Sequence, residues 1–332
     1  MNSTEQGVRR SARAVARLIR ILLLPILSAT CIAHAEIMHE NEEHEFLISI
    51  SYSQDSTLQS NISHSLSRIL SSHLPDTIIT TTNIRDKKNT ASSEADFHIF
   101  IGNTGRGDIK DHPQRERTLY IATDPGAFRL DTDADKKNAV LYMTQSYCMQ
   151  LHLIKLLNDQ WQTIGFLSRA GKIHDTGTIQ RCASKYGLEM FKTNSMGEGH
   201  LTDEIKKTLD HSDALLALPD KAIYNSKTVK NILLTSYRYR KPVIAFSKNF
   251  VSAGALASIY SSPEQIAETA SDIIIQYFKN GQQFSDSINY PQDFDISINR
   301  QVFRALHLVI PDTIRLKKIL YSRKKNNAGE TQ

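Results

Sequence analysis

Apolar runs and amphipathic stretches alternate along most of this chain. In its first half, short runs rich in isoleucine, phenylalanine and threonine have the length and composition of β-strands, and Ser56–Leu70 carries apolar side chains at helical spacing. Two of the runs end at turn-forming residues, Gly102 and Thr123–Pro125, as buried strands of a parallel sheet do. The predicted strands are Phe46–Ser51, Thr77–Thr82, Phe97–Ile101 and Leu119–Ala122.

The second half of the chain repeats this alternation more regularly. Gly187 stands where a helix C-cap is expected, and Ser262–Glu264 has the polar residue and proline that open a helix, which then runs to Gly281. The predicted strands are Thr163–Leu167, Leu188–Phe191, Ala214–Leu218 and Val243–Phe246, and the other predicted helices are Thr176–Tyr186, Leu201–Leu209 and Ser226–Tyr239.

Strands that alternate with helices predict parallel sheets with helices on both faces. Because the two series are separated near Thr144–Leu151, we expect an α/β fold of two doubly wound parallel-sheet lobes, with a hinge and a cleft between them. Such sheets bind ligands outside the carboxyl ends of their strands. The predicted division is a signal peptide at 1–35, a polar leader at 36–45, an N-terminal lobe at 46–145, a C-terminal lobe at 146–285, a hinge-crossing segment at 286–322 and a polar tail at 323–332.

The first 35 residues have the layout of an export signal. Five arginines precede a short apolar run, Ile21–Leu27, and Ala33–Ala35 supplies the small residues that signal peptidase recognises, so we expect cleavage before Glu36. The apolar run is too short for a transmembrane helix. Cys31 is not expected to be a lipidated cysteine, because a lipoprotein signal has a Leu-like residue three positions before the cysteine and this chain has Ser28 there. We therefore expect the mature protein in the periplasm, with a retained N-terminal anchor as the alternative.

Net charge bears on the kind of binding partner, and the cysteines bear on disulfide bonds and metal sites. Of the formal net charge of +5, residues 1–35 carry +4, so the rest of the chain is nearly neutral and its composition indicates no nucleic-acid partner. Cys148 and Cys182 remain after cleavage, and they could pair in an oxidising compartment. Neither their number nor their spacing marks a disulfide scaffold or a zinc site, so we expect them to be buried as apolar thiols.

Three groups of motifs occur in order along the chain. They are Thr123–Ala127 with Asn138–Val140, Lys241–Ser247 with Gly254–Ser258, and Phe294–Asn299 with Ala305–Leu306 and Ile310–Pro311 before a final apolar helix. Together they resemble the ABC transporter substrate-binding protein family, in the branch that includes tryptophan and tyrosine binders, over about residues 46–321. The resemblance implies a type I periplasmic binding fold and delivery of a ligand to a membrane permease.

Two segments depart from the pattern of this family. The family usually carries an Asn-bearing loop after the first strand of the second lobe, where this chain has Ser168–Lys172. It commonly shows a glycine and aromatic segment after the position of Ser258, where this chain has Ile259–Pro263. Both segments lie near the expected ligand edge, so the identity of the ligand stays open. The choice between an ABC permease and another receptor stays open as well.

The candidate ligand-binding residues follow from the strand ends. Hydroxyls and amides there would orient a polar ligand, Asp124 or Asp220 would hold an ammonium group, and Arg169 would hold a carboxylate. Each residue alone is equally typical of a turn or a cap, so the hypothesis rests on the set. The candidates are Tyr52, Ser53, Asn103, Thr104, Thr123 and Asp124 in the first lobe, and Ser168, Arg169, Asp220 and Ser247 in the second.

The sequence holds no assembled catalytic motif, so we predict no enzymatic activity, no cofactor and no metal site. Gly102–Gly107 is rich in glycine but lacks the Gly-Lys-Ser/Thr ending of a phosphate-binding loop, and a turn at the edge of the cleft is expected there. His39 and His44 lie among glutamates in the leader, where we expect a solvated segment, and the other histidines lack ligand spacing.

These observations predict a monomeric periplasmic protein that captures a small polar or amino-acid-like ligand for an ABC-type uptake system. Two alternatives remain. One is an enzyme on the same fold, and the other is a ligand-sensing module that presents itself to a membrane receptor or signalling enzyme.

Overall fold

The computed structural model describes residues 45–52, 57–83, 95–102, 117–122, 137–169, 176–197 and 199–328, with side chains up to residue 324. Several predicted features lie outside these ranges. They are the signal peptide, the leader except for Glu45, the Gly102–Gly107 turn beyond its first residue, and the candidate residues Ser53, Asn103, Thr104, Thr123 and Asp124.

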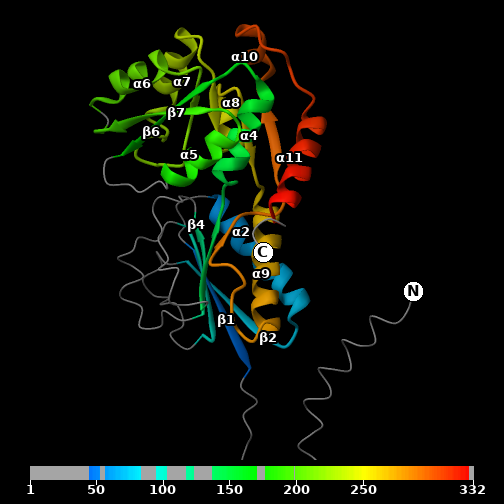
Figure 1. Ribbon diagram of the computed structural model, residues 1–332. Coiled ribbons are helices and arrows are strands. Elements are labelled where there is room, and N and C mark those ends of the chain that lie inside the picture. The colour runs from blue at the N-terminus through cyan, green and yellow to red at the C-terminus, as the bar shows by residue number, and fades with distance from the viewer. Residues whose placement is uncertain are drawn as a thin grey trace, which may run out of the picture. The chain divides into compact units, whose positions relative to one another are not determined.

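The first sheet has six strands, paired in parallel in the order β11-β5-β4-β3-β1-β2 (Figure 1). Its central strands β3 and β4 are buried along their whole length, which explains why their apolar residues form runs and do not alternate with polar ones. The strands are β1 (Phe46–Tyr52), β2 (Thr77–Asn83), β3 (Phe97–Ile101), β4 (Thr118–Ala122), β5 (Asn138–Tyr142) and β11 (Ile288–Asn289).

Two helices, α2 (Thr57–His73) and α9 (Pro263–Lys279), cover one face of this sheet. Leu66 of α2 and Ile274 of α9 are fully buried in one cluster with the strand side chains, and the rings of Phe97 and Tyr277 pack at a centroid distance of 5.0 Å. Full burial of each such side chain contributes about 1.5–3 kcal/mol. We call this sheet with α2 and α9 the first lobe.

The second sheet also has six strands, in the order β12-β10-β9-β8-β6-β7. Five strands are parallel, and β12 pairs with β10 in the antiparallel direction. The strands are β6 (Thr163–Arg169), β7 (Glu189–Ser195), β8 (Ala214–Leu216), β9 (Val243–Ala245), β10 (Ala257–Tyr260) and β12 (Asp295–Ile298). The prediction of two α/β lobes, each built on a parallel sheet, is confirmed, with the direction of β12 as the exception to parallel pairing.

Helices cover both faces of the second sheet. Alternate side chains of its strands point to opposite sides, so each face has its own apolar core. Phe166 of β6 lies in a core with α4, α5, α10 and α11, whereas the neighbouring Leu167 lies in a core with α6, α7 and α8. We call this sheet with these helices the second lobe. The helices are α4 (Tyr147–Leu157), α5 (Thr176–Lys185), α6 (Leu201–Asp210), α7 (Val229–Arg238), α8 (Lys248–Ala253), α10 (Arg300–Ala305) and α11 (Thr313–Ala328).

The packing of α9 differs from the predicted division of the chain. The predicted C-terminal lobe, 146–285, includes this helix, but α9 and Phe284 pack in the core of the first lobe. After β10 the chain returns to the first lobe, forms α9 and β11, and then enters β12 of the second sheet. The alternation of strands and helices identifies the elements, but it does not say which sheet a helix covers.

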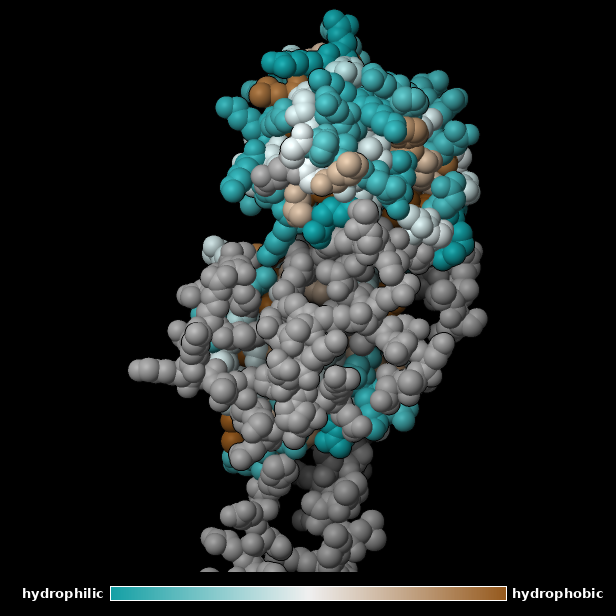
Figure 2. All heavy atoms as spheres, turned by 90° about the vertical axis from the view of Figure 1, so that its left-hand side faces the viewer, coloured by the Kyte–Doolittle hydropathy of each residue, from teal (hydrophilic) through white to brown (hydrophobic). Residues whose placement is uncertain are grey.

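The outer surface of the second lobe is mostly hydrophilic on the side of α6 and α7 (Figure 2). The sequence of α6 explains this, because its apolar residues Leu201, Ile205 and Leu209 share one face and are buried. Exposed apolar side chains on α7 are limited to Leu234 and Tyr237. Within the described ranges, no helix combines the length and the hydropathy that a membrane span needs.

Cys148 and Cys182 form a disulfide bond, so the prediction of two apolar thiols is wrong. The bond joins α4 to α5, and the two Cα atoms lie 4.8 Å apart. Both helices pack on the same face of the second sheet, and this packing brings together two cysteines 34 positions apart in sequence. A loop of this length corresponds to about 4 kcal/mol of stabilisation in the chain-entropy treatment of cross-links.

Reduction of this disulfide is expected to lower the free energy of unfolding by about 2–4 kcal/mol, because the unfolded chain regains the freedom of the closed loop. Urea denaturation with and without a reducing agent measures the difference. A variant with both Cys148→Ser and Cys182→Ser serves as the control, since its stability should not respond to the reductant. Equal stability of the oxidised and reduced protein would contradict the prediction.

Candidate functional site

The chain passes between the two sheets three times, and each crossing follows the carboxyl end of a strand of one lobe. The crossing segments are 143–146 after β5, 261–262 after β10 and 290–294 after β11. Ligands of parallel α/β sheets bind outside the carboxyl ends of the strands. The crossing segments therefore mark the edge of each sheet where a ligand site is expected.

One buried side chain connects the three crossing segments. Gln145 is 2% exposed, and its Nε2 lies 3.0 Å from Ser261 Oγ, 3.0 Å from the Pro291 carbonyl oxygen and 3.4 Å from the Asp293 carbonyl oxygen. Ser261 Oγ also donates to the Asp293 carbonyl, at 2.7 Å. The ends of β5 and β10 are thus held side by side, although they belong to different sheets.

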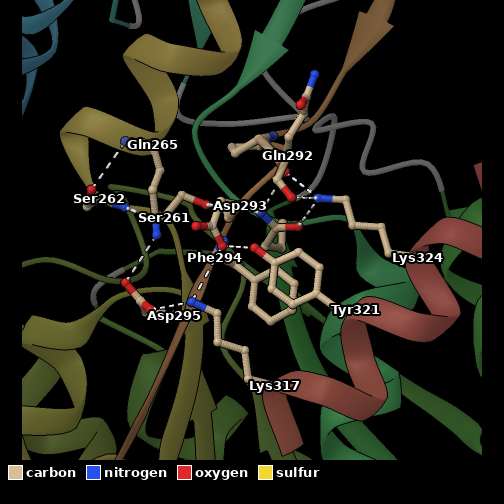
Figure 3. A network of polar contacts seen from close by, with 12 residues as sticks. Ser261, Ser262, Gln265, Gln292, Asp293, Phe294, Asp295, Lys317, Tyr321 and Lys324 are labelled. Atoms are coloured by element: carbon tan, nitrogen blue, oxygen red, sulfur yellow. Dashed lines mark hydrogen bonds and ion pairs between the residues drawn. The ribbon is translucent and has the colours of Figure 1, made fainter. Parts of the chain in front are cut away.

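The start of α9 is fixed to the second lobe by polar contacts. Ser262 caps the helix and forms a capping box with Gln265, which satisfies two backbone N–H groups. Gln265 Nε2 then donates to Asp295 at 3.2 Å, and Lys317 Nζ of α11 donates to the other oxygen of Asp295 at 2.8 Å (Figure 3). This chain of contacts joins α9, β12 and α11.

Helix α11 holds the third crossing segment. Tyr321 donates through its hydroxyl to Asp293, and its ring stacks on Phe294 at a centroid distance of 4.6 Å (Figure 3). Lys324 Nζ donates to the carbonyl oxygens of Pro291 and Gln292. Lys324 falls in the predicted polar tail, 323–332, whereas the structure places it in the last turns of α11 in contact with the crossing segment.

Burial lowers the pKa of Lys324 to about 8, and the nearby carboxylate of Asp293 opposes this effect. An open cavity of about 480 Å³ lies beside this lysine, lined on one side by α9 and on the other by Tyr321 and the crossing segment. The α9 residues that line it include Glu268 and Asp272. None of the predicted site residues lines this cavity.

The structure brings two of the predicted site residues together. Arg169, at the end of β6, donates from Nε to Asp220 Oδ2 at 3.0 Å. Asp220 follows β8 and is 1% exposed, and its Oδ1 accepts from the Ala222 N–H at 2.9 Å. The arginine side chain is 40% exposed. A buried carboxylate and a half-exposed guanidinium therefore form an ion pair at the carboxyl end of the second sheet.

The other described candidates do not join this pair. Ser247 caps α8, where its Oγ accepts from the Phe250 N–H at 3.5 Å, so here the interpretation as a cap holds. Ser168 is fully buried, and its Oγ has no partner among the described residues. Tyr52 ends β1 and is partly exposed. The described part of the chain contains no cluster of three or more side chains that would ligate a metal ion.

Gln145 and Lys324 were not predicted from the sequence. Gln145 carries no turn or cap signal of its own, and because 138–142 was not recognised as a strand, the residues after it were not considered as strand-end candidates. Lys324 gives no comparable signal, because it follows two other basic or polar residues and looks like part of a solvated face.

A family model described as ABC transporter substrate binding protein matches residues 147–319 of the chain. This match confirms the family resemblance that the motifs predicted. A comparison with curated proteins found no match.

Solved structures with similar folds cover most of the chain. A ligand-free, open substrate binding protein with adhesive properties from Clostridium difficile has a TM-score of 0.62 at 18% identity, over 80% of this chain and 96% of its own. An ABC domain in complex with L-Trp from Streptococcus pneumoniae has a TM-score of 0.58 at 16% identity, over 82% and 98%. A conserved domain protein from Vibrio cholerae has a TM-score of 0.59 at 15% identity, over 82% and 98%. At these identities the similarity concerns the fold.

The Gln145→Met variant is expected to be less stable than the parent protein by about 1–3 kcal/mol, because it removes the hydrogen bonds that tie Ser261 Oγ and the Pro291 carbonyl to the first crossing segment. Gln150→Met is the matched control, since Gln150 is also buried but donates only to the Gln145 carbonyl, within the same segment. Urea denaturation compares the two variants. An effect of Gln145→Met no larger than that of the control would refute the assigned role.

The contribution of Lys324 to stability is expected to depend on pH. Its pKa in the folded protein, about 8, lies below the ordinary value of 10.5, so the unfolded state binds more protons between these two pH values. The free energy of unfolding of the parent protein should therefore rise, relative to that of Lys324→Met, from about pH 8 to about pH 10.5. Denaturation curves across this range measure the difference, with Lys318→Met on the exposed face of α11 as the control. A constant or falling difference would contradict the assigned burial.

Proposed function

This chain belongs to the ABC transporter substrate-binding protein family, and from that premise we propose that it captures a small polar or amino-acid-like solute and delivers it to an ABC permease. The family binds substrates and does not transform them, in agreement with the prediction that the chain is not an enzyme. The neighbour from Streptococcus pneumoniae carries L-Trp, which supports the choice of amino acids as the first ligands to test.

The observation that carries this proposal is the hydrogen bond from Gln145 to Ser261, which joins the carboxyl ends of β5 and β10. Each of these strands belongs to a different parallel sheet, and the carboxyl end is the side on which such sheets bind ligands. A solute held at this edge would contact both lobes, and the crossing segments would act as the hinge of a closure around it.

Residues of both lobes would line the proposed site. In the second lobe, Arg169 is the leading candidate, with Asp220 as its buried partner. Since Asp220 is already paired, we assign the role of ammonium partner to Asp124 of the first lobe. The further contacts would come from hydroxyl and amide groups, which orient polar ligands. They are Tyr52, Ser53, Asn103, Thr104 and Thr123 in the first lobe, whereas in the second lobe Ser168 is fully buried and Ser247 caps α8, so neither is proposed as a contact.

We place the mature protein in the periplasm as a monomer, exported by residues 1–35. The disulfide between Cys148 and Cys182 supports an oxidising compartment, because structural disulfides rarely persist in the cytosol.

A thermal-shift screen of the exported, purified protein tests the capture of a solute. The panel contains amino acids, short peptides, sugars, amines and nucleosides. At least one compound should raise the melting temperature in proportion to the logarithm of its concentration, since a ligand present at 100 times its Kd stabilises by about 2.7 kcal/mol. Mass spectrometry should recover that compound unchanged. A chemically converted compound would favour an enzyme, and the absence of any stabilising compound would refute solute capture.

The uptake role is tested in cells that lack the protein. Removal of the chain should abolish high-affinity uptake of the compound found in the screen. Unchanged uptake, together with an altered response of the cells to the compound, would favour the sensing module.

A further inference from the structure

We infer that Arg169 recognises a carboxylate of the ligand, and that Asp220 is the buried counter-ion which orients its guanidinium group. This inference rests on the proposed function, because it assigns a ligand class and a specificity-determining residue to the same site.

The position of Arg169 places it at the ligand edge of the second sheet. It is the last residue of β6, which runs parallel to β8 and, through β8 and β9, to β10. The carboxyl ends of these strands therefore lie at one edge of the sheet. The crossing segment with Ser261 leaves from that same edge, directly after β10.

The contacts of Asp220 show that it supports the arginine and is not itself a ligand group. Its two oxygens accept from Arg169 Nε and from the Ala222 N–H, and the side chain is 1% exposed. A ligand ammonium would have to displace one of these donors and reach a buried oxygen. Asp220 is therefore expected to hold the guanidinium plane in one orientation, as a buried carboxylate behind an arginine does.

The arginine retains donors for a second partner. Its contact with Asp220 is made through Nε, and among the described residues none accepts a hydrogen bond from Nη1 or Nη2. The side chain as a whole is 40% exposed, so the described residues do not enclose it. Its Nη1 and Nη2 groups form a planar pair of donors, which matches the two oxygens of a carboxylate.

The charge balance favours a carboxylate over a phosphate. Arg169 and Asp220 carry opposite unit charges, so the pair is formally neutral, and a singly charged carboxylate adds less uncompensated charge there than a doubly charged phosphate. A doubly charged phosphate would need additional donors.

Binding of paired compounds to the exported protein tests this inference. The probes are the L-amino acids, their carboxamides and inorganic phosphate, and titration calorimetry gives each Kd. At least one amino acid should bind at least 10-fold more tightly than its carboxamide. Arg169→Gln should weaken that amino acid about 10- to 100-fold, the range for loss of a charge-assisted hydrogen bond, and should leave the weak binding of the carboxamide unchanged.

Arg169→Gln removes the guanidinium partner of the buried Asp220 and thereby destabilises the fold. A double variant with Asp220→Asn replaces the ion pair by two neutral amides and keeps the test independent of that effect. This double variant should fold and show the same loss of carboxylate binding. Arg181→Gln, at an exposed arginine of α5, is the control and should bind like the parent protein.

Three results would overturn the inference. The first is equal binding of each amino acid and its carboxamide. The second is unchanged carboxylate binding in both Arg169 variants. The third is failure of every amino acid to bind, whether or not inorganic phosphate binds. If the broader screen still finds a stabilising compound that lacks a carboxylate, solute capture stands and only the role of Arg169 is refuted.

Discussion

A polar group that leaves water must find a partner inside the protein, and in this chain that requirement is concentrated at Gln145. Its side-chain amide is buried where the three crossing segments meet, and it donates to acceptors on the other two. The three crossing segments are thus tied to one another by a few hydrogen bonds, each worth about 1 kcal/mol, whereas each lobe is held by an extensive apolar core. Motion of one lobe against the other is therefore expected at the crossing segments, and not inside the lobes.

The C-terminal helix takes part in this connection. Asp295 accepts from both Gln265 of α9 and Lys317 of α11, and Lys324 binds carbonyl groups of the third crossing segment. A change in conformation at the carboxyl edge of one sheet would therefore act, through these contacts, on elements of both lobes. In the proposed function, this is the physical basis on which a bound solute would alter the arrangement of the lobes, and Arg169 with Asp220 would set which solute does so.

Much of the fold was predictable from the sequence, because the strands of parallel sheets are short apolar runs that end at turn residues. The same rule found Arg169 and Asp220 at strand ends. Helix α4 was missed because it is apolar on nearly all sides and shows no single stripe, with eight buried residues in eleven. The packing of α9 on the first sheet and the pairing of Cys148 with Cys182 depend on contacts between distant segments, which local patterns do not encode. Gln145 was missed for the same reason, since its partners lie more than 100 residues away.

In the proposed function, a solute bound at the carboxyl ends of both sheets draws the two lobes together about the crossing segments. Spin labels on Ser71→Cys of α2 and Lys230→Cys of α7, both exposed positions in different lobes, report the distance between the lobes directly, and Cys148 and Cys182 are protected by their disulfide. Pulsed electron–electron double resonance should give a shorter and narrower distance distribution when a saturating ligand is added. An unchanged distribution at saturation would contradict the account.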